Sequence, residues 1–248
     1  MAVYIAAHKA CRMPAADGYI PLQVGAAINE RLPYTGDDSG HHISEKNPTH
    51  CELTGLYWVW RNTDDDYKGL VHYRRLFTEG GELLSDARIR TLLTTHDAIV
   101  ARTEYLRESA AEEFALHSGH ARDLVLLRQA VAAVDDTVIP AYDRVMAGNR
   151  LSLYNMLIAR RDWFDSYCAW LFAVLERLEP TVDMSGYSAY ERRLYGFLGE
   201  RLLNVYIEHT HAAVYRARVT NTERRAIDTL RLSLRRIKNR LIFAMNRR

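Results

Sequence analysis

Short apolar runs rich in β-forming residues alternate along this chain with longer segments whose apolar residues recur at helical spacing. Buried strands are predicted for residues 2–7 (AVYIAA), 67–73 (YKGLVHY), 97–101 (DAIVA) and 151–159 (LSLYNMLIA), with a last strand at 212–217. Helices are predicted for 47–62, 83–93, 108–147, 162–178, 187–208 and 222–245. Breaks are expected near Gly119 and Pro140, and an interruption from Gly196 to Gly199.

This alternation is typical of an α/β domain with a mostly parallel central sheet flanked by helices. In such sheets ligands bind beyond the carboxyl ends of the strands, where this chain has His8-Lys9 and His72-Tyr73-Arg74-Arg75. Residues 12–46 form a long connection rich in Gly, Pro, Asp and Ser, and connections of that length are usually functional or ordered by a ligand. A ligand site is therefore expected at this edge of the sheet.

Charge is distributed unevenly along the 248 residues. The net charge is +2 on 33 basic and 31 acidic residues, but the tail 221–248 alone holds nine basic and two acidic ones. Residues 1–220 therefore carry 24 basic and 29 acidic groups, a net of −5. With 48% hydrophobic residues, a disordered or fibrous chain is excluded.

The basic tail also carries an apolar stripe at helical spacing, formed by Ile227, Leu230, Leu234, Ile237, Leu241 and Met245. Such a helix suits the surface of an anionic membrane or a partner protein. Nucleic acid is disfavoured as a partner, because a nucleic-acid arm has little need for an apolar stripe. We therefore expect a main domain over 1–220 and a docking helix over 221–248.

The cytoplasm is the default expectation for this chain, because its sequence shows neither a disulfide framework nor a signal peptide nor a transmembrane stretch. Cys11, Cys51 and Cys168 lie far apart, without the spacing of a disulfide framework or a zinc cluster. The N-terminal apolar run is too short for a signal peptide, and no stretch reaches the roughly 18 apolar residues of a transmembrane helix.

Two neighbouring arginines at the end of a buried strand are the first candidate for chemistry. Arg74 and Arg75, with His72 and Tyr73, suit a diphosphate, because guanidinium groups offer permanently charged, bidentate donors. A surface turn with solvated arginines is the structural alternative.

An acidic triplet, Asp64-Asp65-Asp66, stands eight residues earlier and could hold Mg²⁺ or Mn²⁺ with a nucleotide diphosphate. The triplet precedes the strand predicted over 67–73, however, and so lies at the opposite end of that strand from the arginines. An acidic turn is the favoured interpretation. The ten histidines form no metal-binding frame.

A carboxylate in an apolar segment is the candidate general base. Glu200 in GFLGERL could have a raised pKa, although on the residues alone a structural Glu200-Arg201 pair at a helix start is the favoured interpretation. Asn155, inside a predicted strand, needs partners that are either structural or a sugar hydroxyl. Dinucleotide, P-loop and nucleophile-elbow motifs are absent from the sequence.

Several segments together resemble a known bacterial glycosyltransferase family, first catalogued as an uncharacterised domain in capsule, exopolysaccharide and O-antigen clusters. They are YIAAHK with YIPLQVGAA, ISEKNPTHCELTGLYWVWRN, DYKGLVHYRRLF, and LYNMLIARRDWFDSYCAWLF with YGFLGERL. The resemblance runs in order from about residue 2 to 217 and leaves out the tail. It implies a compact GT-A-like fold and, for members with an assigned activity, β-galactofuranosyl transfer from UDP-galactofuranose.

The resemblance also implies roles for single residues. His8, Lys9, His72, Arg74, Arg75 and Asn155 would bind the donor, and Asn47, Glu52 and Arg201 would bind the acceptor or support the site. Glu200 would be the base, with Asp66 as the alternative. Residues 40–44 read Gly-His-His-Ile-Ser where the family typically has Gly-Asp-Asn-Ile-Ser, so the preferred donor or acceptor could differ.

The resulting hypothesis is an inverting glycosyltransferase, peripheral on the inner face of the membrane, that extends a lipid-linked glycan. Arg74 and Arg75 would stabilise the departing UDP, so no cofactor is expected; Mn²⁺ or Mg²⁺ at Asp64, Asp65 and Asp66 is the alternative. Two other functions stay open: transfer of galactopyranose or another hexose from its UDP-sugar, and a non-catalytic adaptor in a polysaccharide-synthesis complex.

Overall fold

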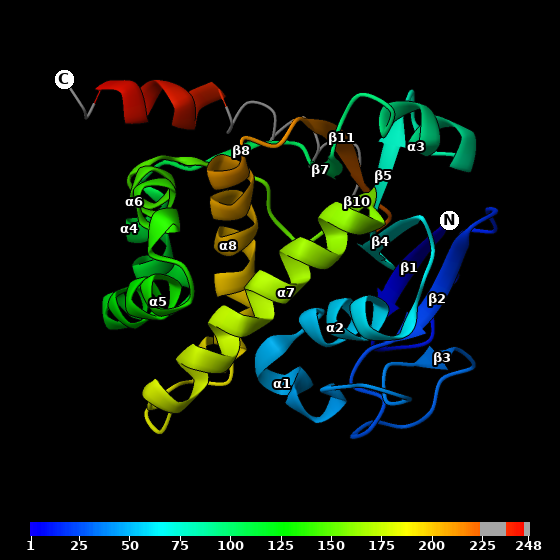
Figure 1. The fold of residues 1–248 in the computed structure, drawn as a ribbon, viewed down its shortest axis with the longest axis horizontal. Helices are drawn as coiled ribbons and strands as arrows, with labels where there is room; N and C mark the ends of the chain where they lie inside the picture. The colour runs from blue at the N-terminus through cyan, green and yellow to red at the C-terminus, as the bar shows by residue number, and fades with distance from the viewer. Residues whose placement is uncertain (224–236, 246–248) are drawn as a thin grey trace.

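The computed structural model describes residues 1–223 and 237–245 (Figure 1). Its strands are β1 (Ala2–Ala7), β2 (Tyr19–Gln23), β3 (Thr35–Gly36), β4 (Tyr67–His72), β5 (Arg75–Glu79), β6 (Glu82–Leu83), β7 (Ala98–Ala101), β8 (Glu104–Tyr105), β9 (Arg150–Leu151), β10 (Leu157–Arg160) and β11 (Val214–Asn221). Its α-helices are α1 (Asn47–His50), α2 (Leu53–Asn62), α3 (Asp86–Leu92), α4 (Ala110–His117), α5 (Ala121–Val134), α6 (Ile139–Ala147), α7 (Arg161–Leu178) and α8 (Leu194–Thr210). The expected strands at 2–7, 67–73, 97–101 and 212–217 and the helix at 162–178 are confirmed, apart from shifts at their ends.

Nine strands form one mixed sheet in the order β3-β2-β1-β4-β10-β7-β11-β5-β6. The pairs on the β1 side are parallel, but β10 runs antiparallel to both β4 and β7, and β5 runs antiparallel to β11. The prediction of a mostly parallel sheet is therefore wrong. One reason is local: β5 follows β4 after only Tyr73 and Arg74, and so short a connection forces the chain to reverse.

The sheet is buried on both faces, and β1 shows how. Ala2, Tyr4 and Ala6 pack into the larger core, against α2, α7 and α8, whereas Val3 and Ile5 face a smaller core that includes α3. A continuous apolar run is the expected pattern for a strand covered on both sides.

Helix α8 is unbroken from Leu194 to Thr210, so the predicted interruption at Gly196–Gly199 is wrong. The two glycines instead permit close packing. A Cβ on Gly196 would lie 3.0 Å from the Cys51 sulfur, and one on Gly199 would lie 2.9 Å from Asn155 Oδ1.

The strand predicted over 151–159 is also wrong in its middle. It divides into β9 and β10, joined by a loop in which Tyr154 and Asn155 have φ angles of 79° and 51°. Two successive residues other than glycine in this left-handed region indicate local strain, which often accompanies a functional site.

Residues 237–245 are helical, and the rest of the predicted 222–245 helix lies outside the described residues except for Thr222 and Glu223. Asn239 on the inner side donates a hydrogen bond to the Tyr105 carbonyl (2.9 Å), whereas Ile237, Leu241 and Met245 remain exposed. Within the described ranges, every helix is too short or too polar to cross a membrane.

Candidate active site

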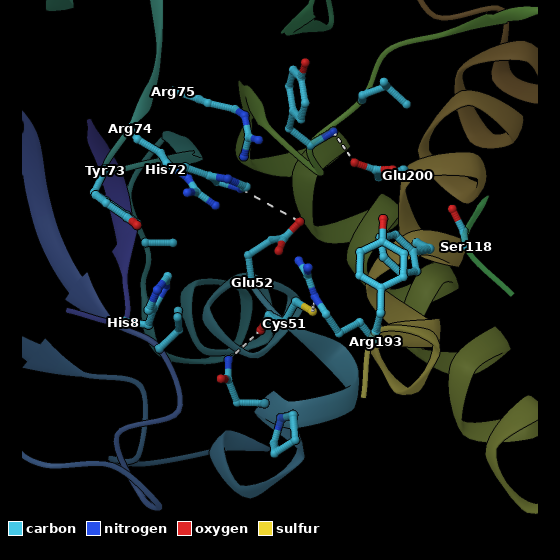
Figure 2. Close-up of a pocket in the computed structure, with 18 of the residues that line it drawn as sticks. His8, Cys51, Glu52, His72, Tyr73, Arg74, Arg75, Ser118, Arg193 and Glu200 are labelled. Atoms are coloured by element: carbon cyan, nitrogen blue, oxygen red, sulfur yellow. Dashed lines mark hydrogen bonds and ion pairs between the residues drawn. The ribbon is translucent and has the colours of Figure 1, made fainter. Parts of the chain in front are cut away.

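A cavity of about 690 Å³ opens where the carboxyl ends of β1 and β4 meet the α1–α2 junction, the loop before β10 and the first turns of α8 (Figure 2). This is the edge of the sheet at which the sequence places a ligand site. Polar groups dominate its lining, and acidic and basic side chains both face it.

Two arginines line the strand side of the cavity. Tyr73 and Arg74 form the turn between β4 and β5, which the Tyr73 N–H ties to the Ala6 carbonyl at 3.1 Å. The Arg74 guanidinium lies 5.6 Å from the Tyr73 ring centre, and that of Arg75 lies 4.4 Å from the Tyr154 ring centre. Stacking on these rings orients both guanidinium groups.

His8 and His72 line the same side as neutral groups. Burial lowers the pKa of His8, and the nearby Arg74 lowers it further. Burial also lowers the pKa of His72, and this effect outweighs the opposite effect of Glu52. Both imidazoles are therefore uncharged at neutral pH, and the positive charge on this wall is carried by the arginines.

Glu52 projects into the middle of the cavity, between the arginines and Arg193 (Figure 2). Asn155 Nδ2 donates to its Oε1 at 2.8 Å and also to the Gly196 carbonyl at 2.9 Å. His72 Nε2 lies 3.9 Å from the same Glu52 oxygen, beyond hydrogen-bond distance. Asn155 thus lies behind the cavity and positions a carboxylate within it.

Three buried polar atoms around this site have no hydrogen-bond partner among the described residues: His72 Nε2, Asn155 Oδ1 and Arg201 Nε. Buried polar atoms are nearly always hydrogen-bonded in folded proteins. Their concentration here indicates a site prepared for a polar ligand or for ordered water.

Glu200 is the second carboxylate of the cavity. Its Oε1 accepts a hydrogen bond from the Tyr154 N–H at 2.7 Å, and its Oε2 lies 3.6 Å from Arg201 Nη1. Burial raises the pKa of Glu200 to about 7, against the opposing effect of Arg201. A carboxylate with a pKa near neutrality is suited to accept a proton.

The contacts of Arg201 are structural ones, to other parts of the fold. Its buried guanidinium forms an ion pair with Glu113, donates to the Phe197 carbonyl at 3.0 Å and lies 5.0 Å from the Phe114 ring centre. It therefore ties α8 to α4 behind the cavity, and its edge contributes to the lining.

The remaining predicted residues lie at the edge of the site or away from it. Lys9 lies outside the lining, 5.4 Å from the Tyr73 ring centre and 3.5 Å from Glu223. Asn47 lines the cavity, and its amide donates to the Cys51 carbonyl at 2.8 Å. Asp66 is not brought into the site: it precedes β4 at the opposite end of the strand and is exposed, 3.3 Å from Arg161.

Asp64 and Asp65 also lie outside the cavity, Asp64 being fully exposed and Asp65 paired with the N-terminal amine. Within the described ranges, no group of three or more His, Cys, Asp or Glu side chains is arranged to hold a metal ion. The acidic triplet thus has the geometry of a surface turn.

The sequence analysis missed a group of residues on the helical side: Cys51, Tyr154, Tyr190, Arg193 and Phe197. Arg193 Nε lies 3.3 Å from the Cys51 sulfur, and burial raises the pKa of that thiol to about 11. One signal was available, namely the run Tyr190-Glu-Arg-Arg, which places an aromatic and two basic residues directly before a helix.

Comparison with known proteins gives two matches. A family model described as "Domain of unknown function (DUF4422)" matches residues 2–211. The fold is similar to the apo structure of a WbbM bifunctional glycosyltransferase, with a TM-score of 0.82 and 26% sequence identity. That match covers 90% of this chain and 45% of the other, so the chain spans about half the length of that enzyme. None of the curated proteins compared with the chain matches it.

Proposed function

The chain belongs to the family described as domain of unknown function DUF4422, and on this premise we propose that it is a glycosyltransferase of GT-A-like fold. It transfers a hexose, β-galactofuranose, from a UDP-sugar to a lipid-linked glycan during synthesis of a cell-surface polysaccharide. The bifunctional glycosyltransferase that shares its fold supports the reaction class.

One observation carries the proposal: Arg74, Arg75 and the carboxylate of Glu200, a side chain only 17% exposed, line a single cavity. Transfer from a nucleotide sugar needs positive charge where the diphosphate departs and a base where the acceptor hydroxyl loses its proton. The cavity offers both, from strand ends on one side and from α8 on the other.

The reaction inverts the anomeric carbon, because the sugar is α-linked in UDP-galactofuranose and β-linked in the product. The acceptor oxygen forms a bond to the anomeric carbon while its proton passes to Glu200. The bond between the anomeric carbon and the phosphate oxygen breaks, and its electron pair leaves with UDP. Arg74 and Arg75 bind the diphosphate and stabilise this charge, while His8, His72 and Lys9 complete the donor site.

A divalent cation held by the Asp64–Asp66 triplet does not fit this arrangement, because these side chains lie at the opposite end of β4 from Arg74. We therefore derive no step through a metal. The two arginines supply the positive charge that a metal would otherwise provide.

The acceptor is membrane-bound in this proposal, and the C-terminal helix places the enzyme on the inner face of the membrane. The exposed stripe of Ile237, Leu241 and Met245 supports this role, as do the nine basic residues of the tail.

The test is release of UDP from UDP-galactofuranose in the presence of a galactose-terminated acceptor, first with chelator and then with Mn²⁺ restored. Turnover with chelator is expected, and the Arg74→Ala variant should be slower by roughly two to three orders of magnitude with its circular dichroism unchanged. Arg88→Ala, which removes an exposed arginine paired with Glu79 outside the cavity, is the matched control. Arg74→Ala turnover close to that of the unmodified enzyme would refute the assignment, and the absence of any UDP affinity would favour the adaptor.

A further inference from the structure

The helical side of the cavity carries an aromatic cluster that the reaction described above does not use. The rings of Tyr190 and Phe197 lie with centres 5.0 Å apart and planes inclined at 43°. The Arg193 guanidinium lies 5.8 Å from the first ring centre and 5.3 Å from the second. We call these three residues the aromatic platform.

The platform is accessible to a ligand. Tyr190 is 52% exposed, Phe197 is half-buried, and both line the cavity. Residues 191–193 form a 3₁₀ turn directly before α8, and Phe197 lies one helical turn after Arg193. Both aromatic residues are therefore presented by one continuous segment.

The turn that contains Cys51 holds Arg193 in place. The Arg193 Nε lies 3.3 Å from the sulfur of Cys51, a residue with a φ angle of 53°. The Asn47 amide binds the Cys51 carbonyl at 2.8 Å and fixes this turn. A strained residue kept by its surroundings is a feature of positioned ligand contacts.

The platform stands apart from the donor wall. In Figure 2, Glu52 lies between Arg193 on one side and Tyr73, Arg74 and Arg75 on the other. The β1 side of the cavity, lined by Ala6, His8 and Val24, would offer room for the base of a nucleotide whose diphosphate binds these arginines. The platform remains for the second substrate.

The chemistry of the platform fits a sugar. The C–H face of a sugar ring packs on aromatic rings, and its hydroxyl groups accept hydrogen bonds from a guanidinium. Glu200 lies on α8 as well, one turn beyond Phe197, so a sugar on the platform has a base within the same cavity.

We propose that Tyr190, Phe197 and Arg193 form the subsite that binds the terminal sugar of the acceptor glycan. This inference rests on the proposed function, because it assigns a binding site to the second substrate of that reaction. It identifies the ligand as a neutral saccharide rather than a nucleoside or a lipid.

The test measures two ligands separately on the full-length protein. Binding of a galactose-terminated trisaccharide is followed by saturation-transfer NMR, and binding of UDP by calorimetry. For Tyr190→Ala we expect trisaccharide binding weaker by about threefold to tenfold, from the loss of one aromatic contact, and unchanged UDP binding. Tyr190→Phe keeps the ring and should restore trisaccharide binding. Tyr215→Ala, on β11 and outside the cavity, is the matched control.

The outcomes separate the two proposals. The subsite is refuted if the unmodified protein does not bind the trisaccharide, if Tyr190→Ala binds it as tightly, or if that variant loses trisaccharide and UDP alike. Trisaccharide binding that depends on Tyr190, in a protein without UDP affinity, would establish the subsite and refute the proposed UDP-sugar reaction.

Discussion

The carboxylate of Glu223 lies 3.5 Å from the guanidinium of Arg74, which lines the cavity. Its other oxygen lies 3.5 Å from Lys9 Nζ, and the adjacent Thr222 N–H donates to the Arg74 carbonyl at 3.1 Å. An anion of the chain itself therefore lies between two cations assigned to the donor. A bound diphosphate would compete with Glu223 for the same positive charge.

Glu223→Gln should accordingly tighten the binding of UDP. The expected change is up to about fivefold, because an exposed ion pair contributes no more than about 1 kcal/mol. Calorimetric titration with UDP at low and high salt measures it, and the gain should shrink as salt screens the pair. Glu208→Gln, which removes another exposed, paired glutamate far from the cavity, is the control. UDP binding that weakens in Glu223→Gln would show that this carboxylate supports the donor site.

The raised pKa of Glu200 leads us to expect that turnover depends on pH. Burial raises the folded-state pKa of Glu200 to about 7, so the carboxylate is mostly protonated below that pH and cannot accept a proton there. Turnover should rise about tenfold per pH unit up to pH 7 and then level off. Burial lowers the pKa values of His8 and His72 below the ordinary histidine value, so both imidazoles lose their protons on the acid side of the Glu200 titration.

The check is a turnover profile from pH 5 to 9 for the natural enzyme and for Glu200→Gln. The variant should be slower by roughly two to four orders of magnitude and should show no rise near pH 7. A rise that persists in Glu200→Gln would assign the titration to another group, and Glu52 would become the candidate.

The buried strands and the arginine pair could be predicted from sequence because both are local signals. An apolar run identifies β1 and β4, and a polar residue that follows such a strand lies at the sheet edge wherever the rest of the chain goes. Glu200 could be predicted in the same way, as a carboxylate in an apolar segment. Burial raises its pKa, which is the physical reason that the sequence analysis gives for choosing it.

Contacts between distant segments could not be predicted. Asn155 and Glu52 are 103 residues apart, and their hydrogen bond depends on a loop at positive φ that the sequence pattern presents as a strand. Arg201 pairs with Glu113 of α4, which no local pattern connects to α8. Gly196 and Gly199 have the sequence signature of a helix break, and only the packing of α8 shows that they serve close approach.

Gly199→Ala should therefore destabilise the protein even though alanine favours helices. The added Cβ would lie 2.9 Å from Asn155 Oδ1 and 2.9 Å from a Leu53 methyl carbon, so one of them must move. We expect a loss of about 1–3 kcal/mol in the free energy of unfolding. In an open helix the same change would stabilise by up to about 1 kcal/mol. Urea denaturation shows whether the substitution lowers or raises the free energy of unfolding.

Gly186→Ala is the matched control, since nothing lies within 4 Å of the position of its Cβ. That variant should stay within about 0.5 kcal/mol of the natural protein. If Gly199→Ala were equally neutral, α8 would have to lie farther from Asn155 than described. Asn155 would then hold Glu52 less firmly.

The apolar stripe of the last helix provides a test of membrane docking that spares the cavity. Ile237, Leu241 and Met245 are exposed by 61%, 60% and 72% and stand four residues apart, on one face. Replacing all three by serine should abolish binding to vesicles of anionic phospholipid and slow transfer to lipid-linked acceptor, with transfer to a short soluble acceptor unchanged.

Deleting residues 222–248 should show the same difference between the two acceptors, but it also removes Glu223 from beside Arg74. The serine variant is the cleaner experiment because it leaves this ion pair in place. Leu116→Ser with Val125→Ser is its control, since these two residues are exposed by 63% and 58% on α4 and α5. An equal loss on both acceptors in the stripe variant would make the helix a part of the fold or of a partner contact. A selective loss on the lipid-linked acceptor would mean that the helix concentrates the enzyme where that acceptor lies.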